Sequence, residues 1–186
     1  MSRDGFNFTR IKNGSRTLSV GPAGAWDSGI IKMGWPQRDG DIRREYYGGS
    51  AWHHGTEPYR PAWHIGLATI RVNGWTYYTP KPDEYRGTVT TIPIDAPAGV
   101  RRGLTVNVEG AAGTPDAFAV EVLEAATGRP LPGFALADGV PLPTDGLAVP
   151  VSWRGGPTLP TGQAIRLRFH LRGKGVRLYS FRFGSA

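Results

Sequence analysis

Short runs in which apolar and polar residues alternate recur along the whole chain, and they predict β-strands. The clearest is Arg166-Leu167-Arg168-Phe169-His170-Leu171, where one face is apolar and the other charged. Residues 117–126 alone have a helix-forming composition, yet Phe118, Val120 and Val122 alternate there as well. We therefore expect a strand in that window and an all-β protein.

The strand candidates along the whole chain are short and are separated by turn residues. They cover residues 18–20, 29–33, 44–48, 64–72, 75–79, 88–94, 104–109, 118–124, 147–153, 165–172 and 176–183. Asn73-Gly74 between two of these runs predicts a tight hairpin, and Thr127-Gly128 predicts another turn. The high content of glycine (27) and proline (16) agrees with many short strands.

A change of composition near residues 95–99 predicts a boundary between two units. Trp, Tyr and His crowd the chain before it, and after it only Trp153 and Tyr179 remain of the Trp and Tyr residues. We interpret residues 1–95 as one aromatic-rich β unit. Residues 100–186 are interpreted as an antiparallel β-sandwich.

The composition excludes several classes of site. There is no cysteine, so disulfides and cysteine-based metal centres are excluded. No glycine-rich loop leads into a helix, and no Ser/His/Asp set has a recognisable context, so neither nucleotide binding nor a hydrolase triad is expected. We predict no metal and no cofactor.

The net charge of +7 suggests a nucleic-acid partner, but the basic residues are dispersed. Those of residues 166–177 alternate with apolar ones, which is typical of the solvent face of a strand, so we expect no specific nucleic-acid binding. The N-terminus carries no apolar run after a basic start, and no stretch approaches the roughly 20 apolar residues needed to cross a bilayer. We therefore expect no signal peptide and no membrane partner.

Polar and aromatic residues crowd the predicted loops of residues 24–69, which favours a binding site there. Asp27 is either a ligand-binding carboxylate or a turn-capping residue. Of Tyr46 and Tyr47, one should point inward and one outward. His64 is expected to be structural, and His170 simply exposed. Adjacent histidines on an extended segment point apart, so His53 and His54 do not suggest a shared metal.

Several segments resemble the C-terminal part of bacterial five-bladed β-propeller glycoside hydrolases. The opening S-R-D-G-F-N-F-T-R resembles a blade-junction signature, and G-A-W-D-S-G-I-I resembles the segment that opens the last blade. Later strands of that blade are similar to Y-Y-G-G-S-A-W-H-H-G, H-I-G-L-A-T-I-R-V-N-G-W and T-V-T-T-I-P-I. The accessory β-sandwich is similar to L-T-V-N-V-E-G, V-E-V-L-E-A-A-T-G-R-P-L-P-G-F, V-S-W-R-G-G and I-R-L-R-F-H-L-R followed by L-Y-S-F-R-F.

The resemblance implies a propeller blade followed by a sandwich, and an oligo- or polysaccharide partner. It implies one edge of a sugar site, built from Asp27, Tyr47, Trp52, His53, His54 and Glu57, with Asp27 as the candidate catalytic carboxylate. Trp26, Trp35, Trp52 and Trp63 could stack on sugar rings or equally fill the space between blades, and we expect one or two of them to be exposed to a ligand. Relatives with this pattern are mostly exported enzymes, whose catalytic carboxylates come from several blades.

Because the family has further blades before the S-R-D-G segment, the resemblance suggests that this chain alone has little or no turnover. A partner chain or further copies would then complete the site. The alternative hypothesis is a non-catalytic structural or self-assembling β protein, in which copies cover one another's sheet edges as a homo-oligomer.

Overall fold

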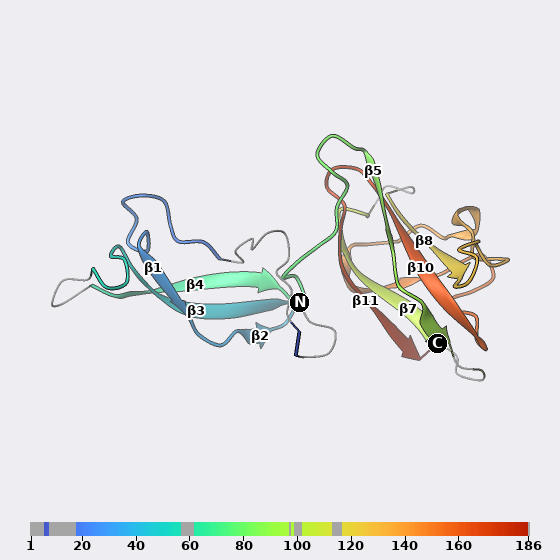
Figure 1. Cartoon of the computed structure of the whole chain (residues 1–186), viewed down its shortest axis with the longest axis horizontal. Coiled ribbons are helices and arrows are strands. Elements are labelled where there is room, and N and C mark those ends of the chain that lie inside the picture. The colour runs from blue at the N-terminus through green and yellow to red at the C-terminus, as the bar shows by residue number, and fades with distance from the viewer. Residues whose placement is uncertain are drawn as a thin grey trace. The chain divides into compact units, whose positions relative to one another are not determined.

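The computed structural model describes residues 6–7, 18–56, 62–96, 98, 102–112 and 117–185 (Figure 1). Strands make up 49% of the chain, and the described part holds no α-helix, which confirms the predicted all-β class and its antiparallel sheets. No closed barrel or propeller forms in this part of the chain. The chain divides into two compact units, Met1–Val72 and Asn73–Ala186.

The sheet of the first unit is built around the long strand β3 (Ile42–Ser50). Strand β4 (His64–Arg71) pairs with one side of β3 along nearly its whole length. Two short strands, β1 (Ile30–Met33) and β2 (Gln37–Asp39), follow one another along the other side. The break between them contains Pro36, which has no backbone N–H for the ladder.

Two expectations for this sheet were wrong. Residues 18–20 do not form a strand, and β2 was not expected, because its three residues are polar and exposed and show no alternation. The other predicted strands of this sheet, at residues 29–33, 44–48 and 64–72, are confirmed as β1, β3 and β4 with small changes of their ends.

The two faces of this sheet differ in how far they are covered. Glu45, Tyr47 and Gly49 of β3 lie on the face that carries Gly66 of β4, and this face is largely covered. The opposite face is open: Tyr46 is 60% exposed, Ile65 81% and Leu67 48%. The prediction that one tyrosine of the pair points inward and the other outward is confirmed.

The second unit contains two antiparallel sheets. In the first sheet, β10 (Gln163–Arg172) pairs with β8 (Phe118–Glu124) on one side. On its other side lie β5 (Arg86–Thr90) and β6 (Ile94–Ala96), one after the other. The second sheet has the order β11 (Arg177–Ser185), β7 (Arg102–Glu109), β9 (Gly146–Val151).

The apolar faces of these two sheets share one core. It is formed by Leu104, Val106 and Val108 of β7, Phe118, Val120 and Val122 of β8, Val149 and Val151 of β9, Ile165, Leu167, Phe169 and Leu171 of β10, and Leu178 of β11, with Trp153. The rings of Phe169 and Phe181 join the sheets, with centroids 5.3 Å apart. The predicted alternation in β10 is therefore confirmed, since every second side chain is buried.

The strand pairing places the boundary between the two units after Val72, earlier than the boundary near residues 95–99 that the composition suggested. Strands β5 and β6 pair with β10, so residues 73–95 belong to the second unit rather than to a unit that ends at residue 95. Asn73 does adopt the positive φ of a turn residue (55°), but the predicted hairpin is wrong. Among the described residues, β4 pairs only with β3, and Tyr78 forms an isolated bridge with Leu178 of β11.

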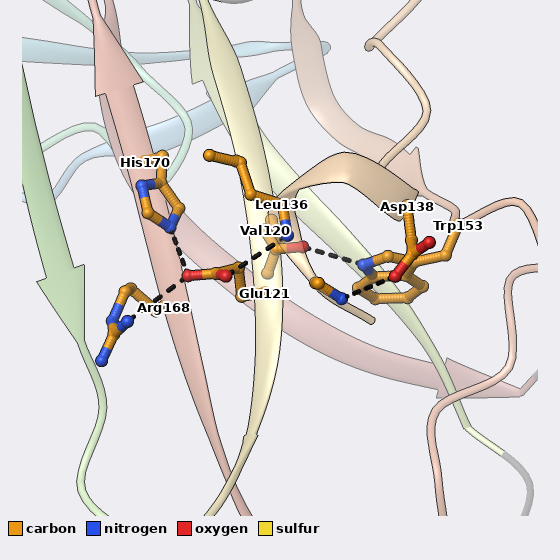
Figure 2. Close-up of polar contacts among 8 residues, drawn as sticks. Val120, Glu121, Leu136, Asp138, Trp153, Arg168 and His170 are labelled. Carbon is orange, nitrogen blue, oxygen red and sulfur yellow. Dashed lines mark hydrogen bonds and ion pairs between the residues drawn. The ribbon is translucent and has the colours of Figure 1, made fainter. Parts of the chain in front are cut away.

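The outward side chains of β10 were expected to be solvated, and this was wrong in part. Arg166 is half-buried and donates to the carbonyl oxygens of Ala125 and Thr91, at 3.2 Å each. His170 is not simply exposed, since its side chain is 25% accessible and bonded to Glu121. The partners come from the neighbouring strand β8, which carries Glu121 (Figure 2), and from residues just after strands, Ala125 and Thr91.

One carboxylate organises the turn that follows β7. Asp145 accepts hydrogen bonds from the backbone N–H groups of Gly110, Ala111 and Ala112, at 2.8, 2.8 and 2.9 Å. Ala111 is 2% exposed, so its N–H would be left without a water partner if this carboxylate were removed.

We predict that Asp145→Ala lowers the free energy of unfolding by about 2–4 kcal/mol, because three charge-assisted bonds are lost, one of them to the N–H of the buried Ala111. Urea titration followed by circular dichroism measures this. Asp83→Ala, in an exposed turn of the same unit, is the control. A loss no larger than that of the control would contradict the role given to Asp145.

Candidate functional site

The structure joins Asp27 and Tyr47, two of the residues that the sequence analysis selected. Asp27 lies in the loop before β1 and is only 9% exposed. The Tyr47 hydroxyl, from β3, donates to Asp27 Oδ2 at 2.8 Å. Backbone bonds from Ala25 N–H to Pro22 O and from Ser28 N–H to Ala25 O fold the loop over the sheet. This carboxylate therefore connects the loop to β3.

Two further rings complete the arrangement. Trp26 stacks on Tyr47, with ring centroids 5.7 Å apart and planes at 18°. The His64 ring meets Trp26 edge-on, at 5.7 Å and 67°. We call Trp26, Asp27, Tyr47 and His64 the aromatic platform. Trp26 remains 39% exposed, so one ring of the platform is accessible from solvent.

Glycines of the sheet make room for these rings. A Cβ added at Gly49 would lie 2.6 Å from the Trp26 ring, and one at Gly66 would lie 2.4 Å from the Tyr47 ring. Distances this short force a side chain or the backbone to move. The bare backbone of β3 and β4 thus forms the floor on which the platform lies.

The other predicted site residues lie in the loop that follows β3. Trp52 is 48% exposed, and its backbone approaches Gly29 so closely that a Cβ there would lie 2.4 Å from the Trp52 carbonyl carbon. His53 and His54 are exposed, and the His53 carbonyl oxygen accepts bonds from the N–H and the hydroxyl of Thr56. Glu57 lies outside the described residues.

Sequence reasoning named Trp26 only as one of four tryptophans that could stack on a sugar, and it left His64 and Glu45 out of the site. Trp26 and His64 belong to the platform, and Glu45 lies two residues before Tyr47 on the same face of β3, only 6% exposed. The period of two along β3 was the signal that could have placed Glu45 beside Tyr47. This face therefore carries two buried carboxyl groups, those of Asp27 and Glu45.

The tryptophans of the first unit are not core residues. Trp26, Trp35, Trp52 and Trp63 are 39%, 92%, 48% and 39% exposed. Trp63 belongs to the open face, where the Lys32 ammonium lies 4.9 Å from its ring centroid. A Cβ added at Gly48 would lie 3.6 Å from the Trp63 ring, which is an ordinary van der Waals distance. The Trp63 ring therefore lies against the sheet at Gly48.

The Asp27 carboxylate changes the acidity of Tyr47. Its hydrogen bond raises the pKa of the Tyr47 phenol above the ordinary value of 10.0, and burial and the negative charge of Asp27 act in the same direction. The phenol therefore stays protonated at neutral pH and continues to donate to Asp27. The pair therefore places a fixed hydrogen-bond acceptor, the Asp27 carboxylate, beside an exposed indole, while the O–H proton of Tyr47 is used within the pair.

The described residues hold neither a cluster of metal-ligating side chains nor a membrane-spanning helix. No group of three or more His, Asp or Glu side chains there is arranged to hold a metal ion. Within the same residues, no helix has the length and apolar character needed to span a bilayer. Comparisons with protein-family models, curated proteins and solved structures gave no match.

We predict that Asp27→Asn lowers the pKa of Tyr47, because the amide keeps the acceptor but loses the charge. In the native chain the bond to Asp27 favours the neutral phenol, which is why the folded-state pKa of Tyr47 is raised. The stabilisation by this bond is therefore present below pH 10 and is lost as pH rises through the folded-state pKa. Tyrosinate absorbance during an alkaline titration measures the shift, and Tyr47→Phe identifies the phenol concerned.

Asp41→Asn is the matched control for this titration, because Asp41 is exposed at the turn before β3. Identical titration curves for Asp27→Asn and Asp41→Asn would contradict the bond between Asp27 and Tyr47.

Proposed function

We propose that this chain is a carbohydrate-active module that resembles the C-terminal part of a propeller glycoside hydrolase. In this proposal the first unit corresponds to a propeller blade and the second to the accessory β-sandwich. The observation that carries the proposal is the buried Asp27 carboxylate, held by Tyr47 directly beside the accessible ring of Trp26.

The chemistry of the platform suits a sugar. A pyranose ring has an apolar C–H face that can pack on an indole, and hydroxyl groups around its rim that need fixed acceptors and donors. The Trp26 indole offers a surface for the C–H face, and the oxygens of the Asp27–Tyr47 pair offer fixed hydrogen-bond acceptors for the hydroxyl groups. Trp52, His53 and His54 follow β3 and are exposed, and in this proposal they supply further aromatic and polar groups to the sugar site.

The proposal assigns sugar binding to this chain with little turnover. Glycosidic cleavage requires two carboxyl groups about 5–10 Å apart on opposite sides of the scissile bond. Asp27 is bonded to Tyr47, and Glu45 is 6% exposed, so neither meets a substrate as a free acid or nucleophile. Asp27 is then a substrate-binding carboxylate, and catalytic groups from a partner chain or further copies complete the site.

We predict weak binding of neutral oligosaccharides, detected by titration calorimetry or by NMR shifts of indole N–H signals. Trp26→Ala and Trp52→Ala should each weaken this binding about tenfold, about 1.4 kcal/mol, because the ring that packs on the sugar is removed. Trp35→Ala is the matched control, since Trp35 is 92% exposed in the break between β1 and β2. Equal affinities for all three variants and the native chain would refute the platform as the sugar site.

The open face of the first sheet favours self-assembly as a second candidate function. Tyr46, Ile65 and Leu67 form an exposed apolar row on adjacent strands, and such rows are commonly covered by a partner. In a propeller the neighbouring blade would cover this face. In a self-assembling protein a second copy would cover it.

We predict for this second function that the native chain forms a defined oligomer and that Ile65→Lys with Leu67→Lys makes it monomeric, because charge is costly to bury. Light scattering coupled to size exclusion gives the mass. Thr90→Lys, an exposed position of the second unit, is the control. A native chain that is monomeric at all concentrations measured would rule out self-assembly and leave the sugar-binding proposal unaffected.

A further inference from the structure

An Asn-Gly pair lies where the chain passes from the first unit to the second, since Asn73 directly follows the boundary at Val72. Backbone hydrogen bonds hold the chain on either side of the pair, at Val72 and at Tyr78. Residues 73–77 between them, all in the described part of the chain, belong to no strand. Asn73 and Gly74 therefore lie outside the ladders that restrain the backbone elsewhere.

Within the described residues, neither the side-chain amide of Asn73 nor the N–H of Gly74 makes a hydrogen bond. Asn73 is exposed, and so are Trp75, Thr76 and Tyr77, so water reaches this segment. Asn73 also has a positive φ of 55°, a conformation that is uncommon outside glycine. Because Gly74 has no Cβ, little steric hindrance opposes movement of its nitrogen toward the Asn73 amide.

We propose that Asn73 is a site of spontaneous deamidation. The Gly74 nitrogen loses its proton to hydroxide and attacks Asn73 Cγ, which forms a C–N bond and closes a succinimide ring. The bond from Cγ to the amide nitrogen breaks, and that nitrogen takes a proton from water and leaves as ammonia. Water then adds to one of the two ring carbonyls and opens the ring, which gives aspartate or isoaspartate. No carbon changes its oxidation state.

The Asp-Gly pairs of the described chain have a glycine in the same position, but their carboxyl groups are occupied. Asp39 forms an ion pair at 2.7 Å. Asp138 and Asp145 accept hydrogen bonds from backbone N–H groups. An ionised carboxylate is also a poorer electrophile than an amide, because its negative charge repels the attacking nitrogen. The reaction therefore favours Asn73 over these aspartates.

Asn107 is protected by the sheet of the second unit. It is 1% exposed and lies inside β7, opposite Ser180 of β11. The β-branched Val108 follows it and crowds the backbone nitrogen that would attack. The sheet must open locally before Asn107 can react. The chain thus carries an unreactive asparagine that serves as an internal reference for Asn73.

Deamidation changes this segment in two ways. The neutral amide becomes a carboxylate, so the net charge of +7 falls by one. In isoaspartate the main chain runs through the side-chain carbon, which lengthens the connection between the two units by one methylene. Because residues 73–77 lie outside the strands, we expect both units to keep their free energies of unfolding.

The test incubates the whole native chain in mildly alkaline buffer and follows its tryptic peptides by mass spectrometry. Trypsin places Asn73 and Asn107 on separate peptides, both distinct from that of Asn13, whose Asn-Gly pair lies outside the described residues. The peptide of residues 72–86 should gain about one mass unit, roughly tenfold faster or more than the Asn107 peptide. It should separate into two products, one with aspartate and one with isoaspartate.

Asn73→Gln should slow this mass gain roughly tenfold or more, because the longer side chain closes a larger and less favourable ring. Gly74→Ala should slow it as well, since a Cβ shields the attacking nitrogen, and it gives a second measure in case the glutamine variant does not fold. Thr76→Ala, an exposed change in the same segment, is the matched control and should leave the rate unchanged.

Equal rates at Asn73 and Asn107 in the native chain would overturn the proposal. A single aspartate product would overturn it too, because direct hydrolysis of the amide, without a ring, gives no isoaspartate. A mass gain as fast in Asn73→Gln as in the native chain would have the same meaning. None of these variants touches the aromatic platform, so the result is independent of the sugar-binding proposal.

Discussion

A carboxylate that leaves water must find hydrogen-bond donors, and this requirement determines how the loops of the protein lie on its sheets. Asp27 holds the loop before β1 to Tyr47 of β3. Asp145 holds three backbone N–H groups of the turn after β7. Glu121 joins the 3-10 turn η2 (Leu136–Asp138) to His170 of β10. In each case one acidic side chain fixes a segment that has little regular hydrogen bonding of its own.

The carboxylates of Asp27 and Glu121 act in different ways. In the aromatic platform, the buried Asp27 carboxylate follows directly after the accessible Trp26 in the chain and keeps Tyr47 protonated. In the second unit, the Glu121 side chain is only 8% exposed and holds the His170 ring and the Leu136 N–H in place.

Much of the fold could be predicted from local sequence, because alternation along a strand reports which face is buried. In β10, Leu167 and Phe169 are buried and Arg168 is not, as the pattern requires. Pairing between distant strands leaves no such local signal. The sequence around Asn73 predicted a hairpin to residues 75–79, whereas Tyr78 forms a bridge with Leu178, about a hundred residues later.

The candidate sites show the same limit. Asp27 and Tyr47 were selected one at a time, and their bond spans twenty residues of sequence. Trp26 was one of four tryptophans that the sequence could not rank, because the space above Gly49 and Gly66 that accepts the Trp26 and Tyr47 rings depends on the strand register. His170 was expected to be exposed, because its partner Glu121 lies on another strand.

The interrupted edge of the first sheet has a consequence for how that sheet can grow. The side of β3 that carries β1 and β2 breaks at Pro36, so an incoming chain would meet two short ladders out of line rather than one continuous row of donors and acceptors. Strand β4 has eight consecutive residues and, within the described residues, no partner beyond β3. Any segment that extends this sheet by strand addition therefore has a full-length template on the β4 side, which gives the sheet a direction of growth.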